Sequence, residues 1–458
     1  MPNDAVPAAD AVPAADAAAV PTAAAAVPTA DAEAPPTAPG DRAQWRYRPR
    51  WALRHRRALR ATAVFGVLAL CGLVLLALLR EKTGTEGFVA GLGLAVLPVP
   101  LLLAAFRWLD RVDPGPWKNL IFAFAWGSGA AALMALTANT FAIRWIAGAT
   151  ATTDPDDVLS LGATFVAPVV EESVKGAALL LFFLLRRRHF TGLVDGVVVA
   201  GVTATGFAFT ENILYLGSAF GEDLATGASV LGSKTVGTFF GRIVLTPLAH
   251  PLFTVCTGIG FGLAAATARR RRARRVLLPL GGLLLAMGVH ALWNGSAVRS
   301  PLGFLAVYGA FMVPALALLT WLAIWSRQRE LRTISGRLPA YAAAGWLAPA
   351  EPLALSSMRA RAMARSFASA AYGPAAARAV HEYEGFATSL AFLRDRAHRG
   401  TADADFTARE QELLHHLWQR KEFASPALTY AAGATGRFRP APPPPPHRDY
   451  TGPNPYRA

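Results

Sequence analysis

The sequence SLGATFVAPVVEESVKGAALLLFFLL occupies residues 160–185, enough to cross a bilayer as one helix, which takes about 20 apolar residues. Three ionisable residues, Glu171, Glu172 and Lys175, interrupt it. On a helix Lys175 shares a face with both glutamates, because it follows them by four and three residues. One lysine can neutralise one carboxylate. The other carboxylate needs a partner on another helix or a metal ion, since an unpaired buried charge is costly.

Other apolar stretches of similar length precede and follow this one. The chain of 458 residues is 53% hydrophobic and only 16% charged, which argues against an ordinary soluble protein and against a disordered one. We therefore predict an all-α fold, a polytopic membrane bundle of about eight transmembrane helices. Besides 160–185, the predicted spans are 61–79, 87–106, 120–143, 195–217, 244–267, 276–296 and 302–325.

The distribution of charge indicates how the bundle is oriented. The net charge is +15, and the arginines gather in short clusters in alternate connections between the apolar stretches. Such asymmetry is typical of the positive-inside rule, and it predicts that both termini are cytoplasmic. We expect a multi-pass membrane protein in contact with the lipid bilayer and no nucleic-acid partner, despite the basic composition. The sequence leaves the oligomeric state open.

The segments outside the bundle differ in composition. The start of the chain is almost entirely Ala, Pro, Val, Thr and Asp, which cannot build a core, and the end carries a proline run. Between the last span and that end we expect amphipathic helices at 353–371, 374–399 and 406–423. The predicted divisions are a disordered segment 1–41, a basic juxtamembrane segment 42–60, the bundle 61–325, a cytosolic helical region 326–424 and a Pro-rich disordered tail 425–458.

Further polar residues lie inside the predicted spans, where they are rare and usually functional. Glu211, His250, His290 and Asn294 fall on three spans other than 160–185. Counted at 1.5 Å per residue from the cytoplasmic ends, all of them lie at a similar depth, about 21–27 Å, level with the glutamate pair. Residues on four consecutive helices thus form one polar layer, somewhat outside the midplane. We interpret this layer as a functional intramembrane site.

Two kinds of chemistry fit such a layer. A glutamate can act as general base, a metal held by His and Glu can activate water, and Asn and His can stabilise an oxyanion, so the layer suits peptide hydrolysis. The alternative is a membrane transporter or ion-binding protein that uses the same buried Glu/His cluster. We find no convincing repeat between the two halves, although transporters often have one. Periodicity alone does not decide between the two.

The order of the polar motifs resembles that of the PrsW family of intramembrane proteases, which is related to the CAAX prenyl proteases and the CPBP membrane proteases. The motifs are Glu171-Glu172-x-x-Lys175, Phe207-x-x-x-Glu211-Asn212, His250 and His290-x-x-x-Asn294. The segment Asp110–Trp117, DRVDPGPW, is also similar to the family's segment before its core helices. The resemblance covers roughly residues 95–325 and rests on all four motifs occurring in order on successive spans.

The resemblance implies an intramembrane endopeptidase that hydrolyses a peptide bond of a membrane-anchored substrate. The family's expected substrate is an anti-sigma factor or another single-pass protein, cut near the extracytoplasmic side. Carried over to this sequence, Glu171 or Glu172 would activate water, with the choice between them open. Glu211 would be a second acid/base or a ligand.

The remaining roles also follow from the resemblance. His250 and His290 would bind a metal or the tetrahedral intermediate, and Asn294 would donate to the oxyanion. A metalloprotease reading gives a divalent metal, zinc, held by His250, His290 and Glu211. A glutamate-activated water without metal is the other reading. Lys175, Phe207 and Asn212 would support these groups.

Overall fold

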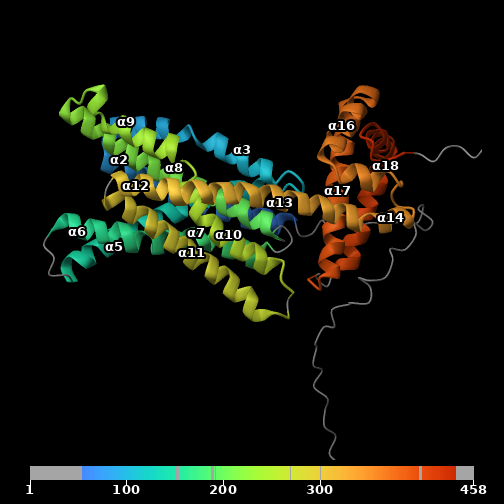
Figure 1. The fold of residues 1–458 in the computed structure, drawn as a ribbon, viewed down its shortest axis with the longest axis horizontal. Helices are drawn as coiled ribbons and strands as arrows, with labels where there is room; N and C mark the ends of the chain where they lie inside the picture. The colour runs from blue at the N-terminus through green and yellow to red at the C-terminus, as the bar shows by residue number, and fades with distance from the viewer. Residues whose placement is uncertain are drawn as a thin grey trace, which may run out of the picture.

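Apolar helices too long for one ordinary soluble domain dominate the computed structural model, which describes residues 54–149, 154–186, 190, 192–268, 270–299, 301–401 and 405–439. The predicted disordered segment 1–41, most of the basic segment 42–60 and the proline run lie outside the described residues. Every regular element in the described part is helical. Figure 1 shows two parts, an elongated helix bundle and a C-terminal group of helices that the long helix α13 (Val313–Arg337) joins to it.

The bundle has the lengths and composition of a multi-pass membrane protein. Six helical segments of the described chain could cross a bilayer: Ala61–Leu109, Trp117–Ala149, Leu193–Thr226, Lys234–Ala265, Arg272–Ser296 and Leu302–Ala343. The first contains two predicted spans, and helix α2 (Arg54–Val96) is broken between them at Gly84, whose φ of 72° is non-helical. The remaining predicted span, 160–185, corresponds to helix α7 (Ala167–Leu185) and the turn before it. The prediction of an all-α polytopic bundle is confirmed.

Helix α8 (Leu193–Thr226) is the centre of the bundle. Its apolar span is 78% buried, against 17% for Ala61–Leu109 and 6% for Leu302–Ala343. Glycines let its neighbours approach closely, as is usual for membrane helices. A Cβ on Gly196 would lie 2.1 Å from the Gly258 carbonyl oxygen of helix α10 (Ala249–Ala265), and one on Gly91 would lie 2.5 Å from the Ile213 carbonyl oxygen.

Several helices contain a wider, π-helical turn. Helix α4 (Trp117–Ala125) passes through η3 (Trp126–Ala131) into α5 (Ala132–Ala149), and α6 (Pro155–Leu161) passes through η4 (Gly162–Val166) into α7. The short helix α9 (Lys234–Phe239) continues as η7 (Phe240–Leu245). Such turns shift the phase of a helix and are frequent at functional sites. The other bundle helices are α3 (Val99–Leu109), α11 (Arg272–Arg299) and α12 (Pro301–Val307), which passes through η8 (Tyr308–Met312) into α13.

The C-terminal region is a separate cluster of helices with an apolar core. It comprises α14 (Pro339–Ala343), α15 (Glu351–Leu355), α16 (Met358–Tyr372), α17 (Pro374–His398) and α18 (Phe406–Ala434). The predicted helix 353–371 is divided between α15 and α16. The predicted irregular tail from 425 is also wrong at its start. Helix α18 continues through Pro426 to Ala434, because alanines and Leu428 on one face are fully buried in the core.

The connection between α3 and α4 ties the two parts together. Val112, in the segment Asp110–Trp117, is fully buried within the core of the C-terminal region. Its carbonyl oxygen accepts a hydrogen bond from Nη1 of Arg361 in α16, at 3.3 Å. Beside this contact, a cavity of about 940 Å³ is lined by α3, this connection, α16 and α17. The segment that resembles the family therefore forms the junction between the bundle and the C-terminal region.

Candidate active site

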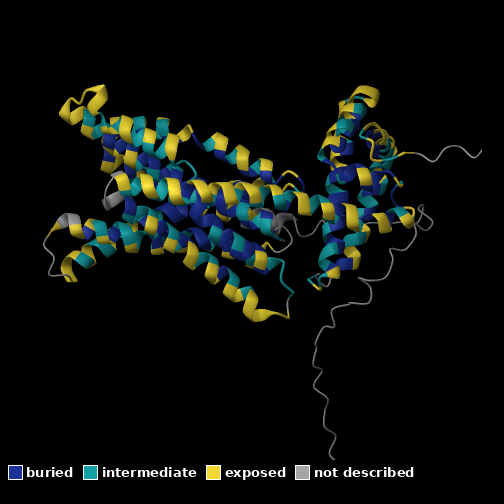
Figure 2. Cartoon of the chain, viewed as in Figure 1, coloured by how far each residue is buried: buried dark blue, intermediate teal, exposed yellow. Residues whose placement is uncertain are grey.

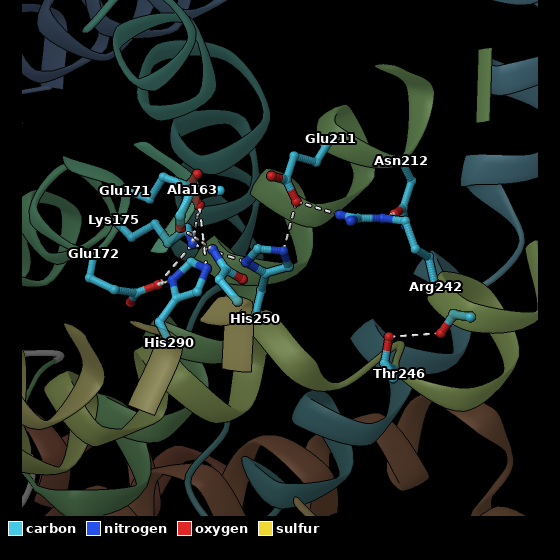
Figure 3. Close-up of polar contacts among 12 residues, drawn as sticks. Ala163, Glu171, Glu172, Lys175, Glu211, Asn212, Arg242, Thr246, His250 and His290 are labelled. Carbon is cyan, nitrogen blue, oxygen red and sulfur yellow. Dashed lines mark hydrogen bonds and ion pairs between the residues drawn. The ribbon is translucent and has the colours of Figure 1, made fainter. Parts of the chain in front are cut away.

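Four neighbouring helices bring the predicted polar layer together inside the bundle (Figure 3). Helix α7 carries the glutamate pair and Lys175, α8 carries Glu211 and Asn212, α10 carries His250, and α11 carries His290 and Asn294. Glu172 and Lys175 are 0% exposed, His290 2% and Glu171 5%, so this is a buried ionic cluster rather than a surface feature.

Lys175 is the cation at the centre of the cluster. Its Nζ lies 2.8 Å from Glu172 Oε1, 3.4 Å from Glu171 Oε2 and 3.1 Å from His250 Nδ1. The ammonium also lies 4.0 Å from the centre of the Phe207 ring. The sequence spacing led us to expect that Lys175 neutralises one carboxylate, and the structure brings it to both.

Glu172 is the more firmly held of the two α7 glutamates. Oε1 lies 3.1 Å from His290 Nδ1, and Oε2 accepts a 2.8 Å hydrogen bond from Thr254 Oγ1. Glu171 has longer contacts, 3.5 Å to Asn139 Nδ2 and 3.9 Å to His290 Nε2. Glu171 thus retains hydrogen-bonding capacity that Glu172 has already used.

The hydrogen bonds of His250 fix which of its nitrogens carries the proton. An ammonium has only donors, so the Nδ1 atom facing Lys175 must be an acceptor. Nε2 then carries the proton and donates to Glu211 Oε2, 2.7 Å away. His290 has Nδ1 on Glu172 and Nε2 toward Glu171. In each histidine a carboxylate holds one nitrogen, whereas the other nitrogen faces Lys175 in His250 and Glu171 in His290.

These orientations define a group that could hold a metal ion. Glu171, His250 and His290 each offer one ligand atom, and the three atoms lie within 4.8 Å of one another. We had predicted His250, His290 and Glu211 as the ligands. The structure brings Glu171 to the two histidines instead, because Glu211 lies on the far side of the His250 ring.

Arg242 is a further member of the site, outside the residues predicted for it from the sequence. It comes from η7, donates through Nη2 to Glu211 Oε2 and donates through Nε to Asn212 Oδ1 at 2.8 Å. Thr254 and Asn139 were also missed. Thr254 had a weak signal, since it follows His250 by four residues and so shares its helix face.

Asn294 and Phe207 lie beside the ionic cluster. Asn294 Nδ2 donates to the carbonyl oxygen of Ala163 in η4 at 2.9 Å, which leaves the other amide hydrogen for a further acceptor. The Phe207 ring packs 5.7 Å from that of His250. Asn212 is turned toward Arg242 rather than toward the glutamates. The contacts therefore join Glu171, Glu172, Lys175, Glu211, His250 and His290, with Phe207 packed against them, whereas Asn212 contacts Arg242 and Asn294 contacts Ala163.

Comparison with known proteins shows what this bundle is similar to. Residues 115–319 match the model of the PrsW family intramembrane metalloprotease. A Protease PrsW from Geobacillus kaustophilus (strain HTA426) is 35% identical over 106 residues, which are 23% of this chain and 40% of that protein. A Protease PrsW from Clostridioides difficile (strain 630) is 27% identical over 165 residues, which are 36% of this chain and 62% of that protein. No solved structure matches the chain.

The matched segment coincides with the site. It contains α7, α8, α10 and α11 and ends within α13, whereas the C-terminal region lies outside it. The chain spans less than two thirds of the length of these two relatives. The resemblance noted from the motifs, over roughly 95–325, is confirmed by an independent match over nearly the same helices. Over residues 115–319, the chain is therefore similar to the PrsW family of intramembrane metalloproteases.

Proposed function

We propose that this protein is an intramembrane endopeptidase, a zinc metalloprotease that hydrolyses a peptide bond of a membrane-anchored protein. One observation carries the proposal. Three ligand atoms of Glu171, His250 and His290 converge within 4.8 Å inside a helix bundle, and a separate carboxylate orients each histidine. A membrane protein maintains such a costly polar group where chemistry requires it.

The residues present fit a catalytic zinc ion. Two histidines and one glutamate are a known catalytic donor set, and the fourth position stays open for water or substrate. Glu211 and Glu172 are outer carboxylates of the kind that fix the tautomer of ligating histidines. A zinc ion at these ligands supplies a Lewis acid that polarises a carbonyl and activates water. The ammonium of Lys175 contacts Nδ1 of His250, the ring nitrogen that carries a free lone pair. The ammonium and a metal ion would therefore compete for that lone pair.

The geometry supports different roles for the two α7 glutamates. Glu172, held by Lys175, His290 and Thr254, orients His290 and balances the lysine. Glu171, with its longer contacts, is the carboxylate at the reacting centre, where it binds the metal or takes a proton from water. The second amide hydrogen of Asn294 is our candidate donor to the oxyanion of the tetrahedral intermediate.

The depth of the site supports cleavage near the extracytoplasmic side. Glu171 lies 14 residues before the end of α7 at Leu185, about 21 Å along the helix axis. The arginines that follow this end would be cytoplasmic by the positive-inside rule, as would both chain termini. We therefore propose a multi-pass protein of a bacterial inner membrane that cuts a single-pass substrate, such as an anti-sigma factor, close to its outer end.

The test compares the N-termini of membrane proteins from cells that express matched amounts of three forms. These are the wild type, Glu171→Gln and the control Glu222→Gln, which changes an exposed carboxylate at the end of α8 paired with Lys234. We expect new N-termini near the outer ends of single-pass spans with the wild type and the control, and none with Glu171→Gln. The purified wild type should contain stoichiometric zinc. Identical N-termini from all three forms would contradict the proposal.

A further inference from the structure

We propose that Arg242 is a positioning residue of the active site, which holds Glu211 and, through it, the imidazole of His250. This inference rests on the proposed proteolytic function and adds a residue to its machinery. Arg242 touches neither Glu171 nor His290, so its effect has to pass through Glu211.

The guanidinium of Arg242 is fixed on three sides. Nη2 donates to Glu211, Nε donates to Asn212 at 2.8 Å, and the guanidinium carbon lies 4.1 Å from the centre of the Tyr215 ring. A planar fork of donors that also stacks on an aromatic ring is specific to arginine, because the lysine ammonium is a point charge on a flexible stem. These contacts set the orientation of the group as well as its distance from Glu211.

A single oxygen atom of Glu211 links Arg242 to His250. Glu211 Oε2 accepts from Arg242 and also from His250 Nε2, at 2.7 Å (Figure 3). Among the described residues, these two are the ones that hydrogen-bond Glu211. The Glu211 side chain is 20% exposed, so without Arg242 it is free to turn toward water. His250 would then lose the carboxylate that holds its ring, with Nδ1 facing Lys175, beside Glu171 and His290.

The local fold explains how Arg242 reaches Glu211. The π-helical turn η7 follows α9 and is closed at its end by Thr246, whose backbone N and Oγ1 donate to the Gly241 carbonyl at 3.0 and 2.8 Å. The wide turn presents Arg242 to α8, where Glu211, Asn212 and Tyr215 lie one turn apart. Phe240 and Val244 of the same turn are exposed, so Arg242 is its polar anchor on the bundle.

The test uses the full chain and a single-pass reporter protein that contains a cleavage site found with the wild type. The variants are Arg242→Gln, Arg242→Lys, Glu211→Gln and the Glu211→Gln/Arg242→Gln double variant. Arg80→Gln is the matched control, because Arg80 is an exposed arginine of α2 that contacts only Thr85 among the described residues. Thermal unfolding in detergent checks that each variant is folded.

We expect Arg242→Gln to lower kcat by about 10–100-fold, the usual effect of losing a group that orients a ligand. KM should change by less than about 3-fold, since Arg242 does not touch the substrate. Arg242→Lys should recover part of the loss by restoring the charge without the fork. Because Arg242 acts through Glu211, the double variant should be no slower than Glu211→Gln alone.

Three results would overturn the inference while leaving the protease intact. They are a wild-type rate for Arg242→Gln, multiplying losses in the double variant, and a rise in KM without a fall in kcat. Zinc retention against a competing chelator gives a readout that does not need cleavage. Arg242→Gln should lose zinc at about 10–100-fold lower chelator concentration, and equal retention would contradict the inference. A wild type that cleaves no protein and binds no zinc would instead refute the proposed function.

Discussion

The membrane bundle and the C-terminal region are built in opposite ways. In the bundle, Glu172 and Lys175 are fully buried while apolar side chains such as Leu101, 72% exposed, cover the outside. In the C-terminal region, Tyr341 and Tyr383 are fully buried. There, the Arg420–Glu382 ion pair lies outside the core, and the buried Glu384 pairs with the partly exposed Arg365. Figure 2 shows the buried residues of both parts on the inner faces of their helices.

The difference follows from the solvent of each part. Lipid tails are as apolar as leucine, so burying leucine does little to hold membrane helices together. The bundle relies on close backbone contacts at glycines and on satisfied polar groups. The C-terminal region relies on the apolar area it removes from water. A buried charge in the bundle therefore indicates function, whereas a buried tyrosine in the C-terminal region indicates packing.

The largest expected difference is between variants of two buried carboxylates, Glu172 in the bundle and Glu384 in the C-terminal region. Glu172→Gln leaves Lys175 with one charged partner, Glu171 at 3.4 Å, and should destabilise the bundle by about 3 kcal/mol. It should also reduce cleavage by at least about 100-fold, since it releases His290. Glu384→Gln, whose partner Arg365 is 27% exposed, should cost about 1 kcal/mol and leave cleavage unchanged. Thermal unfolding measures the loss of stability of each variant, and the reporter protein measures the loss of cleavage. Equal losses of cleavage in the two variants would contradict the difference proposed between the two parts.

A smaller effect distinguishes the packing of the two parts. Gly196→Ala places a methyl group 2.1 Å from the Gly258 carbonyl oxygen, so the two helices must separate. This should lower the stability of the bundle by at least about 1–3 kcal/mol. Gly385→Ala in α17 meets nothing within 4 Å and should stabilise that helix by about 0.5–1 kcal/mol. The unfolding midpoints of the two variants should move in opposite directions. A shift in the same direction would show that backbone contact does not limit the bundle.

The smallest effect concerns pH at the junction between the parts. Burial, helped by the charge of Asp195, raises the pKa of Asp110 to about 8 despite its 3.0 Å ion pair with Arg107. Burial also raises the pKa of Asp113 to about 6. Because both carboxyls bind protons more tightly when folded, their contribution is complete below about pH 4 and is lost as pH rises through 6 to 8.

This dependence can be followed by limited proteolysis of the C-terminal helices between pH 5 and pH 8.5. Cleavage of those helices should increase with pH in the wild type. Asp110→Asn, which keeps an oxygen to accept from the Gly115 N–H, should show a weaker increase. If proteolysis of Asp110→Asn increased with pH as steeply as that of the wild type, the Asp110 carboxyl would be excluded as the cause of the pH dependence.

Much of the architecture could be predicted from sequence because a bilayer restricts the choices. Only helices satisfy their own backbone in lipid, so apolar lengths give the spans. Depth along those spans was enough to bring Glu171, Glu211, His250 and His290 to one layer. The length of α18 was missed, because the Pro-rich composition of 425–458 predicts an irregular tail although the alanines around Pro426 face the core.

The finer arrangement of the site depends on rotation of the helices, which spacing does not specify. Depth counting cannot distinguish Glu171 from Glu211 as the partner of two histidines, because both lie in the same layer. Arg242 reaches Glu211 through the π-helical turn η7, and no residue pattern in that segment announces such a turn. Close contacts of this kind depend on the packing of α8 against its neighbours.

The burial of Val112 in the C-terminal core has a consequence for the order of assembly. Its partner Arg361 lies 249 residues further along the chain. At usual rates of synthesis, that separation means a delay of roughly 12–50 s between the two residues. All the helices of the active site are complete before the C-terminal region exists to receive the loop. The junction must therefore close after the helices of the polar layer have been synthesised, so a ribosome-bound chain passes through a stage in which this loop is undocked.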